Sequence, residues 1–144
     1  EPQGGGLVEF YVHTGSKVAV LISLISEGSE SINNESINHM AKDLCMHIAA
    51  TSPVCVSREN VPEDLVAKEK EIAMAQAEGK PPQAIEKIVQ GKLEKYFSTS
   101  CLLEQPFVKN PDQTVRELVD LVCKESGLSL KVDRFIRFQV GEDS

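Results

Sequence analysis

Residues 61–97 constrain the fold more than any other part of the chain. They predict two helices folded back on each other at a tight break, Glu78-Gly79-Lys80-Pro81-Pro82, because glycine and paired prolines do not continue a helix. The first arm opens with Pro62 and two acidic residues, which suit the positive end of a helix dipole. The second arm has an apolar stripe at helical spacing. This stripe consists of Ile85, Ile88, Val89, Leu93, Tyr96 and Phe97.

The first arm has a weaker stripe, formed by Val61, Leu65, Ile72 and Ala75. A helical hairpin of this kind offers no group for bond-making chemistry, so it indicates a protein that binds another protein. We expect Leu65, Ile72, Ile85 and Val89 to form one of two contacts. Either they make a dimer seam with a second copy, or they pack on the chain's own core.

Length and charge narrow the class of protein further. A chain of 144 residues buries one sizeable core, so we expect one domain over residues 7–144, with the hairpin inserted at about 61–97. The glycine-rich residues 1–6 are interpreted as a linker or fragment edge. The formal net charge of −7 disfavours nucleic acid as a partner, because phosphate binding needs a basic face. No apolar run reaches the roughly 20 residues of a membrane span, and no secretory signal is visible.

Four cysteines are spread along the chain without the Cys-x-x-Cys spacing that zinc and redox sites favour. They are Cys45, Cys55, Cys101 and Cys123. We expect free thiols in a reducing compartment, with a disulfide or metal role as the alternative.

The remaining elements follow from periodicity. Residues 7–13 and 17–25 predict two strands paired as a hairpin, and residues 37–48 predict a helix that Ser52-Pro53 ends. Residues 98–111 are interpreted as a connector. Thr114 and Glu117 have the spacing of a capping box at the start of a last helix, which Gly127 ends.

A final strand is predicted from apolar residues at even steps, with Arg134 interrupting that face. These residues are Leu130, Val132, Ile136, Phe138 and Val140. The order of elements favours an α+β domain, in which helices cover one face of a small, mostly antiparallel sheet and the helical hairpin projects.

No catalytic constellation, metal site or cofactor site emerges from the sequence. The only histidines are His13, His39 and His47. His39 and His47 are eight positions apart on one predicted helix, which does not make a two-histidine metal site, and we expect a solvated or capping role for both. His13 ends a strand beside a glycine turn. This is a common place for a residue that contacts a partner, although an ordinary edge position is an equal alternative.

Several motifs, in order, resemble translation elongation factor Ts over about residues 7–142. They are Tyr11-Val12-His13, Lys17-Val18-Ala19-Val20-Leu21, Asp43-Leu44-Cys45-Met46-His47-Ile48-Ala49-Ala50, Val56-Ser57-Arg58-Glu59-Asn60-Val61-Pro62, Glu78-Gly79-Lys80-Pro81 and Lys87-Ile88-Val89-Gln90-Gly91-Lys92-Leu93. The most specific are Leu102-Leu103-Glu104-Gln105-Pro106-Phe107-Val108 and Arg134-Phe135-Ile136-Arg137-Phe138.

The resemblance implies a guanine-nucleotide exchange factor that binds elongation factor Tu and releases its GDP, without being an enzyme. It implies that His13, with the turn residues Gly15 and Ser16, belongs to the surface that binds Tu. It also implies that residues 62–97 match the family's projecting hairpin, often a dimer contact. The implied compartment is the bacterial cytoplasm, or the matrix of a mitochondrion or plastid.

Two departures from the family pattern matter. The family's Thr-Asp-Phe-Val loop, whose Asp and Phe wedge near the Mg²⁺ site of Tu, maps onto Gly28, Ser29, Glu30 and Ser31, which include neither residue type. The family's small N-terminal helical domain has no counterpart in this sequence. We expect either the C-terminal part of a longer factor or a paralogue that keeps docking and has lost exchange; the first is favoured.

Overall fold

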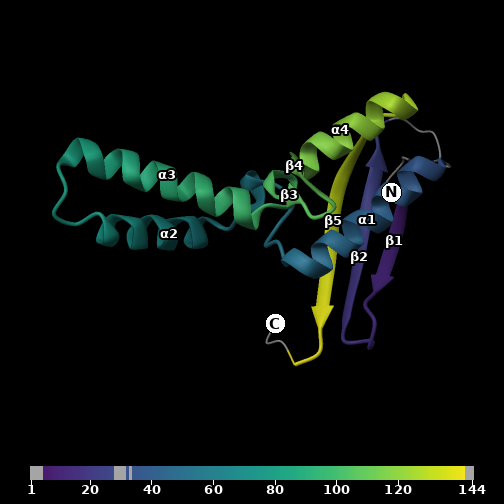
Figure 1. Ribbon diagram of the computed structural model, residues 1–144, viewed down its shortest axis with the longest axis horizontal. Coiled ribbons are helices and arrows are strands. Elements are labelled where there is room, and N and C mark those ends of the chain that lie inside the picture. Colours follow the sequence, from purple (N-terminus) through teal and green to yellow (C-terminus); the bar gives the residue numbers. More distant parts are fainter. Residues whose placement is uncertain (1–4, 28–31, 33, 142–144) are drawn as a thin grey trace.

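A computed structural model of the chain describes residues 5–27, 32 and 34–141. Its main sheet has three antiparallel strands in the order β1-β2-β5 (Figure 1). These strands are β1 (Gly6–Val12), β2 (Val18–Ser26) and β5 (Leu130–Gln139). The predicted pairing of the first two strands is confirmed, with Phe10 opposite Leu21 and Val12 opposite Ala19. The sheet therefore begins at Gly6, the last residue of the segment interpreted as a linker.

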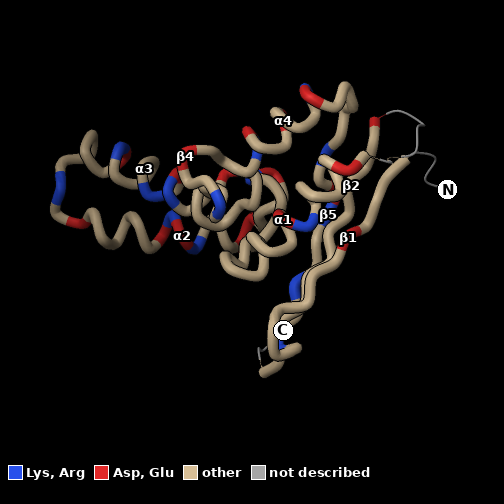
Figure 2. The backbone as a smooth tube through the Cα atoms, turned by 45° about the vertical axis from the view of Figure 1, so that its right-hand side comes forward, with Lys and Arg blue, Asp and Glu red and all other residues tan. Residues whose placement is uncertain are grey.

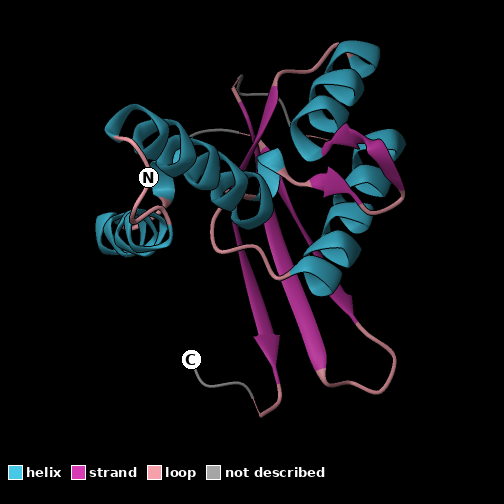
Figure 3. Cartoon of the chain, turned by 60° about the vertical axis from the view of Figure 1, so that its left-hand side comes forward, coloured by secondary structure: helices cyan, strands magenta, loops and turns pink. Residues whose placement is uncertain are grey.

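Two helices, α1 (Glu35–Thr51) and α4 (Val115–Ser126), pack on one face of this sheet. Figure 3 shows them on the same side of the three strands. The core lies between these layers, and its buried residues include Val20, Ile22, Leu24, Ile37, Leu44, Ile48, Leu102, Val115, Val119 and Val132. The predicted α+β class, with a small antiparallel sheet covered by helices, is confirmed.

Local chemistry sets the ends of both helices. The side chain of Asn34 accepts a hydrogen bond from the backbone N–H of Ile37 and caps α1. Ser52 ends that helix in the left-handed conformation, one residue before Pro53. The predicted capping box is present, because Thr114 and Glu117 each bond the other's backbone N–H. Gly127, with φ of 75°, ends α4 as expected.

The helical hairpin consists of α2 (Glu63–Gln76) and α3 (Pro82–Ser100). It extends away from the sheet and its covering helices (Figure 1), and Figure 2 shows acidic and basic residues spaced along both arms. Two residues of the predicted stripe of α2 are exposed in the single chain. Ala73 is buried between the arms, whereas Ile72 and Ala75 are exposed.

The predicted last strand is present as β5, but its apolar residues do not share one face, and that part of the expectation is wrong. Ser23 pairs with Arg134 and Leu24 pairs with Val132, so Asp133 is an extra residue on β5. A β-bulge of this kind changes which alternate residues face the core. Leu130 and Val132 point inward on one side of the bulge, whereas Phe135 packs on the core beyond it.

Residues 98–111, interpreted as a connector, contain regular structure. They include the end of α3, a 3₁₀ turn η2 (Leu102–Glu104), the strand β3 (Pro106–Phe107) and the start of its antiparallel partner β4 (Asn110–Thr114). A second 3₁₀ turn, η1 (Arg58–Asn60), precedes the hairpin. Phe107 is buried and anchors this small ribbon to the core. None of the described helices combines the length and the apolar composition that crossing a bilayer requires.

Candidate protein-binding surfaces

The sheet face opposite α1 and α4 is apolar and open to solvent. The bulge at Asp133 creates much of it, because Ile136 and Phe138 point away from the core and Phe138 is 67% exposed. Cross-strand neighbours extend the patch, since Leu21 lies between Phe10 and Ile136. The exposed apolar residues of this face and its edge are Val8, Phe10, Val12, Leu21, Ile136, Phe138 and Val140. Contiguous exposed apolar patches are typical of interaction surfaces, so this face is a candidate for one.

The turn that joins β1 to β2 lies at one end of this face. His13 receives a hydrogen bond at its backbone O from the N–H of Ser16 (2.9 Å), and its own N–H donates to Val18 O (2.9 Å). Gly15 and Ser16 have positive φ values of 97° and 57°, which the tight turn requires. The hydroxyl of Tyr11 lies 2.9 Å from Nδ1 of His13. The three residues expected to contact a partner are therefore all exposed on one turn.

The structure says nothing of the expected wedge loop, because Gly28, Ser29, Glu30 and Ser31 lie outside the described residues. The hairpin residues are placed, and they differ in accessibility. Val89 is only 8% exposed because it lies in the seam between α2 and α3, and Leu65 and Ile85 are half-buried. Ile72 is 42% exposed and is the most accessible of the four.

An ion-pair cluster joins the root of the hairpin to the body of the domain. The guanidinium of Arg58 in η1 binds two carboxylates, each through two N–H groups. Glu94 comes from α3 and Glu104 from η2, and the same guanidinium lies 4.6 Å from the ring centroid of Phe97. These hydrogen bonds raise the pKa of Arg58 and lower that of Glu94. A planar fork suits this arrangement better than the single ammonium of lysine.

His47 is fully buried in α1, so the expected solvated or capping role is wrong for this residue, whereas His39 is exposed. Nδ1 of His47 accepts the backbone N–H of Val108 (3.2 Å), so Nε2 carries the proton and donates to Oε1 of Gln105 (2.8 Å). Burial lowers the pKa of His47. Gln105 also accepts from Thr51 Oγ1 (3.1 Å) and donates to Thr99 O (2.8 Å). The imidazole and the amide thus connect α1, α3 and the β3–β4 ribbon.

These contacts hold elements of the fold together. Within the described residues, no group of three or more His, Cys, Asp or Glu side chains is placed to hold a metal ion. Neither the open sheet face nor the Arg58 cluster was predicted from the sequence. One sequence signal for the cluster was present, because Arg58 and Glu104 both lie in motifs that resemble the family. The surfaces described above offer apolar side chains and a few polar groups to a binding partner.

The sequence model of the family described as Elongation factor TS matches residues 2–142. Proteins named elongation factor Ts from Carboxydothermus hydrogenoformans and Acetivibrio thermocellus are each 44% identical over 139 residues, or 95% of this chain. The chain spans 64% and 65% of the length of these two relatives. It spans 44% of the corresponding protein from Bdellovibrio bacteriovorus, which is 44% identical over 137 residues, or 94% of this chain.

Proposed function

The chain belongs to the elongation factor Ts family, and on that premise we propose that it docks on elongation factor Tu and promotes the release of GDP during translation. The match along residues 2–142 is the observation that carries this proposal. The exposed turn at His13 and the open apolar sheet face support it, because both suit contact with a protein. We place this action in the bacterial cytoplasm or an organelle matrix.

The physical basis of exchange is linkage between two binding sites. A partner that prefers the nucleotide-free state of a GTPase lowers the affinity of the GTPase for nucleotide. Because the coupling is reciprocal, bound nucleotide lowers the affinity of the GTPase for the partner by the same factor. No covalent bond forms or breaks in this process, so the chain acts as a binding protein and not as an enzyme. Because residues 28–31 contain no Asp-Phe pair, we expect firm docking with weak acceleration of GDP release.

Elongation factor Tu loaded with fluorescent GDP tests the proposal. Addition of the chain is expected to give a complex at micromolar concentration and to raise the rate of GDP dissociation only slightly. His13→Ala should weaken the complex, whereas His39→Ala, which removes an exposed histidine from α1, should not. Absence of a complex, or equal effects of the two substitutions, would argue against the assigned surface.

The second candidate is an exchange-inactive paralogue that acts as an interaction or dimerisation module. The open sheet face and the exposed Ile72 on the hairpin favour it, since both are apolar and accessible. Sedimentation distinguishes the two surfaces. Ile72→Asp should shift a hairpin dimer toward monomer, and Phe138→Ser should do so for a dimer formed through the sheet. Val89→Asp is the poorer probe, because Val89 is buried between the arms and the change would destabilise the hairpin itself.

A further inference from the structure

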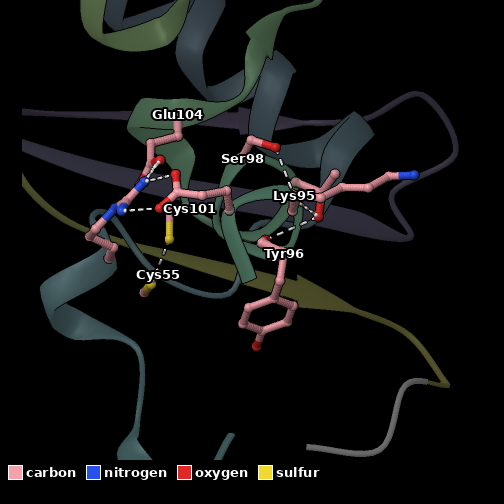
Figure 4. A network of polar contacts seen from close by, with 9 residues as sticks. Cys55, Lys95, Tyr96, Ser98, Cys101 and Glu104 are labelled. Atoms are coloured by element: carbon pink, nitrogen blue, oxygen red, sulfur yellow. Dashed lines mark hydrogen bonds and ion pairs between the residues drawn. The ribbon is translucent and has the colours of Figure 1, made fainter. Parts of the chain in front are cut away.

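Two thiols face each other at the root of the helical hairpin. Cys55 lies between α1 and η1, and Cys101 directly follows α3; their sulfur atoms are 3.9 Å apart (Figure 4). The backbone holds the two residues in place as partners in an isolated parallel β-bridge. The N–H of Leu102 donates to Cys55 O (2.9 Å), and the N–H of Val54 donates to Ser100 O (2.7 Å).

We propose that Cys55 and Cys101 are an oxidisable pair that closes into a disulfide at the root of the hairpin. Bridge partners on neighbouring strands have backbones roughly 4.8 Å apart, within the range of about 4.4–6.8 Å between Cα atoms that a disulfide spans. Rotation of the two side chains is therefore enough to bring the sulfurs to bonding distance. In the thiol form, Cys55 donates to Ser57 O (3.1 Å), and this bond is given up on closure.

The two thiols differ in access, and this sets the order of the steps. Cys55 is half-buried and Cys101 is fully buried, so a peroxide reaches Cys55 first. Hydrogen peroxide converts the Cys55 thiol to a sulfenic acid and releases one water. The sulfur of Cys101 then attacks the sulfenic sulfur and expels hydroxide, which leaves as a second water with the proton of the Cys101 thiol. Two thiols lose two electrons in total, and the peroxide gains them.

Burial slows the oxidation of this pair. A slow reaction suits a response to sustained oxidation and not a catalytic cycle. Burial raises the pKa of Cys101 to about 12 and also raises that of Cys55. Because the thiolate is the reactive form, we expect the rate of closure to rise with pH over the range 7–9.

The bond would change how the hairpin is attached. Cys55 and Cys101 are 46 positions apart, and the whole of α2 and α3 lies between them. In the thiol form, hydrogen bonds and the Arg58 ion pairs hold the root. In the disulfide form, the two segments that enter and leave the hairpin are also joined covalently, so the attachment depends less on ionic strength.

The test uses the purified chain, fully reduced and then treated with hydrogen peroxide at pH 8. Free thiols are blocked by alkylation, and peptides are mapped by mass spectrometry. Before alkylation, the expected product is about 2 Da lighter than the reduced chain, and it contains one bridge, between the peptides of Cys55 and Cys101. The same treatment in urea should give mixed pairings, because the fold no longer selects the partners.

Two matched substitutions complete the design. Cys55 and Cys123 are both half-buried, and each thiol donates to a backbone carbonyl. Cys55→Ser should abolish the bridge, and Cys123→Ser should leave it unchanged, with circular dichroism confirming the fold of both. Bridges to Cys45 or Cys123 in the native chain, peroxide products that stop at sulfinic acid on Cys55, or a bridge that survives Cys55→Ser would each overturn the proposal.

Discussion

Replacing Gln105 by glutamate tests the buried polar contact that joins three parts of the fold. The Gln105 side chain is 4% exposed, and its Nε2 donates to Thr99 O at 2.8 Å. Gln105→Glu keeps the shape and replaces this donor with an oxygen. When ionised, the new carboxylate would face the carbonyl of Thr99 at hydrogen-bond distance with no proton between them. The folded variant must therefore hold the new carboxyl protonated.

The cost of this protonation can be calculated. A glutamate with an ordinary pKa of about 4.3 is about 2.7 units below pH 7, and each unit costs about 1.4 kcal/mol, so folding loses up to about 3.7 kcal/mol. At pH 5 the same cost is about 1 kcal/mol. Protonation of His47 does not remove this cost, because an ionised carboxylate at position 105 would still face Thr99 O with no proton between them. The deficit relative to the unmodified chain should therefore shrink as the pH falls.

Urea unfolding followed by circular dichroism at pH 7 and pH 5 measures the deficit directly. Gln90→Glu is the matched control, since Gln90 is exposed on α3 and the same change of atoms there should have little effect. A variant at Gln105 that is as stable as the unmodified chain at pH 7, or a deficit that grows on acidification, would refute the reasoning.

Three further predictions follow from other contacts. His47 has a lowered pKa in the folded state, so the unfolded chain binds more protons below about pH 6.5. The free energy of unfolding should therefore fall by up to about 1.4 kcal/mol for each unit by which the pH is lowered in that range. His47→Gln should remove this slope in urea titrations. Arg58→Lys should destabilise by about 1 kcal/mol, a value kept small because the Arg58 side chain is 38% exposed, and a double-mutant cycle with Glu104→Gln should reveal coupling. Phe138→Ser should leave the melting temperature nearly unchanged but reduce association in sedimentation, and a large loss of stability would contradict the open face.

Periodicity and capping chemistry predicted most of the elements. The β1–β2 pairing, α1, the capping box at Thr114 and the helical hairpin all depend on neighbours within a few positions, which a sequence displays directly. The bulge at Asp133 was not predicted. A single extra residue leaves the even spacing of the apolar residues intact but changes the face of the sheet to which they belong. The strand β3 has two residues, too few to show a period.

Long-range contacts were harder to predict. His47 and Gln105 are 58 positions apart, and nothing in the spacing of His47 on its helix distinguishes a buried imidazole from a solvated one. The closeness of Cys55 and Cys101 likewise depends on the hairpin returning to the place from which it left. Helix propensity predicts each arm of the hairpin, whereas only tertiary packing brings the residues before and after the hairpin together.

The length of the hairpin makes it a lever. The 19 residues of α3, at about 1.5 Å each, give an arm of about 28 Å. A tilt of about 10° about the base of α3 would displace the tip by about 5 Å. A small change in the charges or the thiols at the root of the hairpin would therefore cause a larger displacement at its tip. A molecule bound at the tip would be displaced with it.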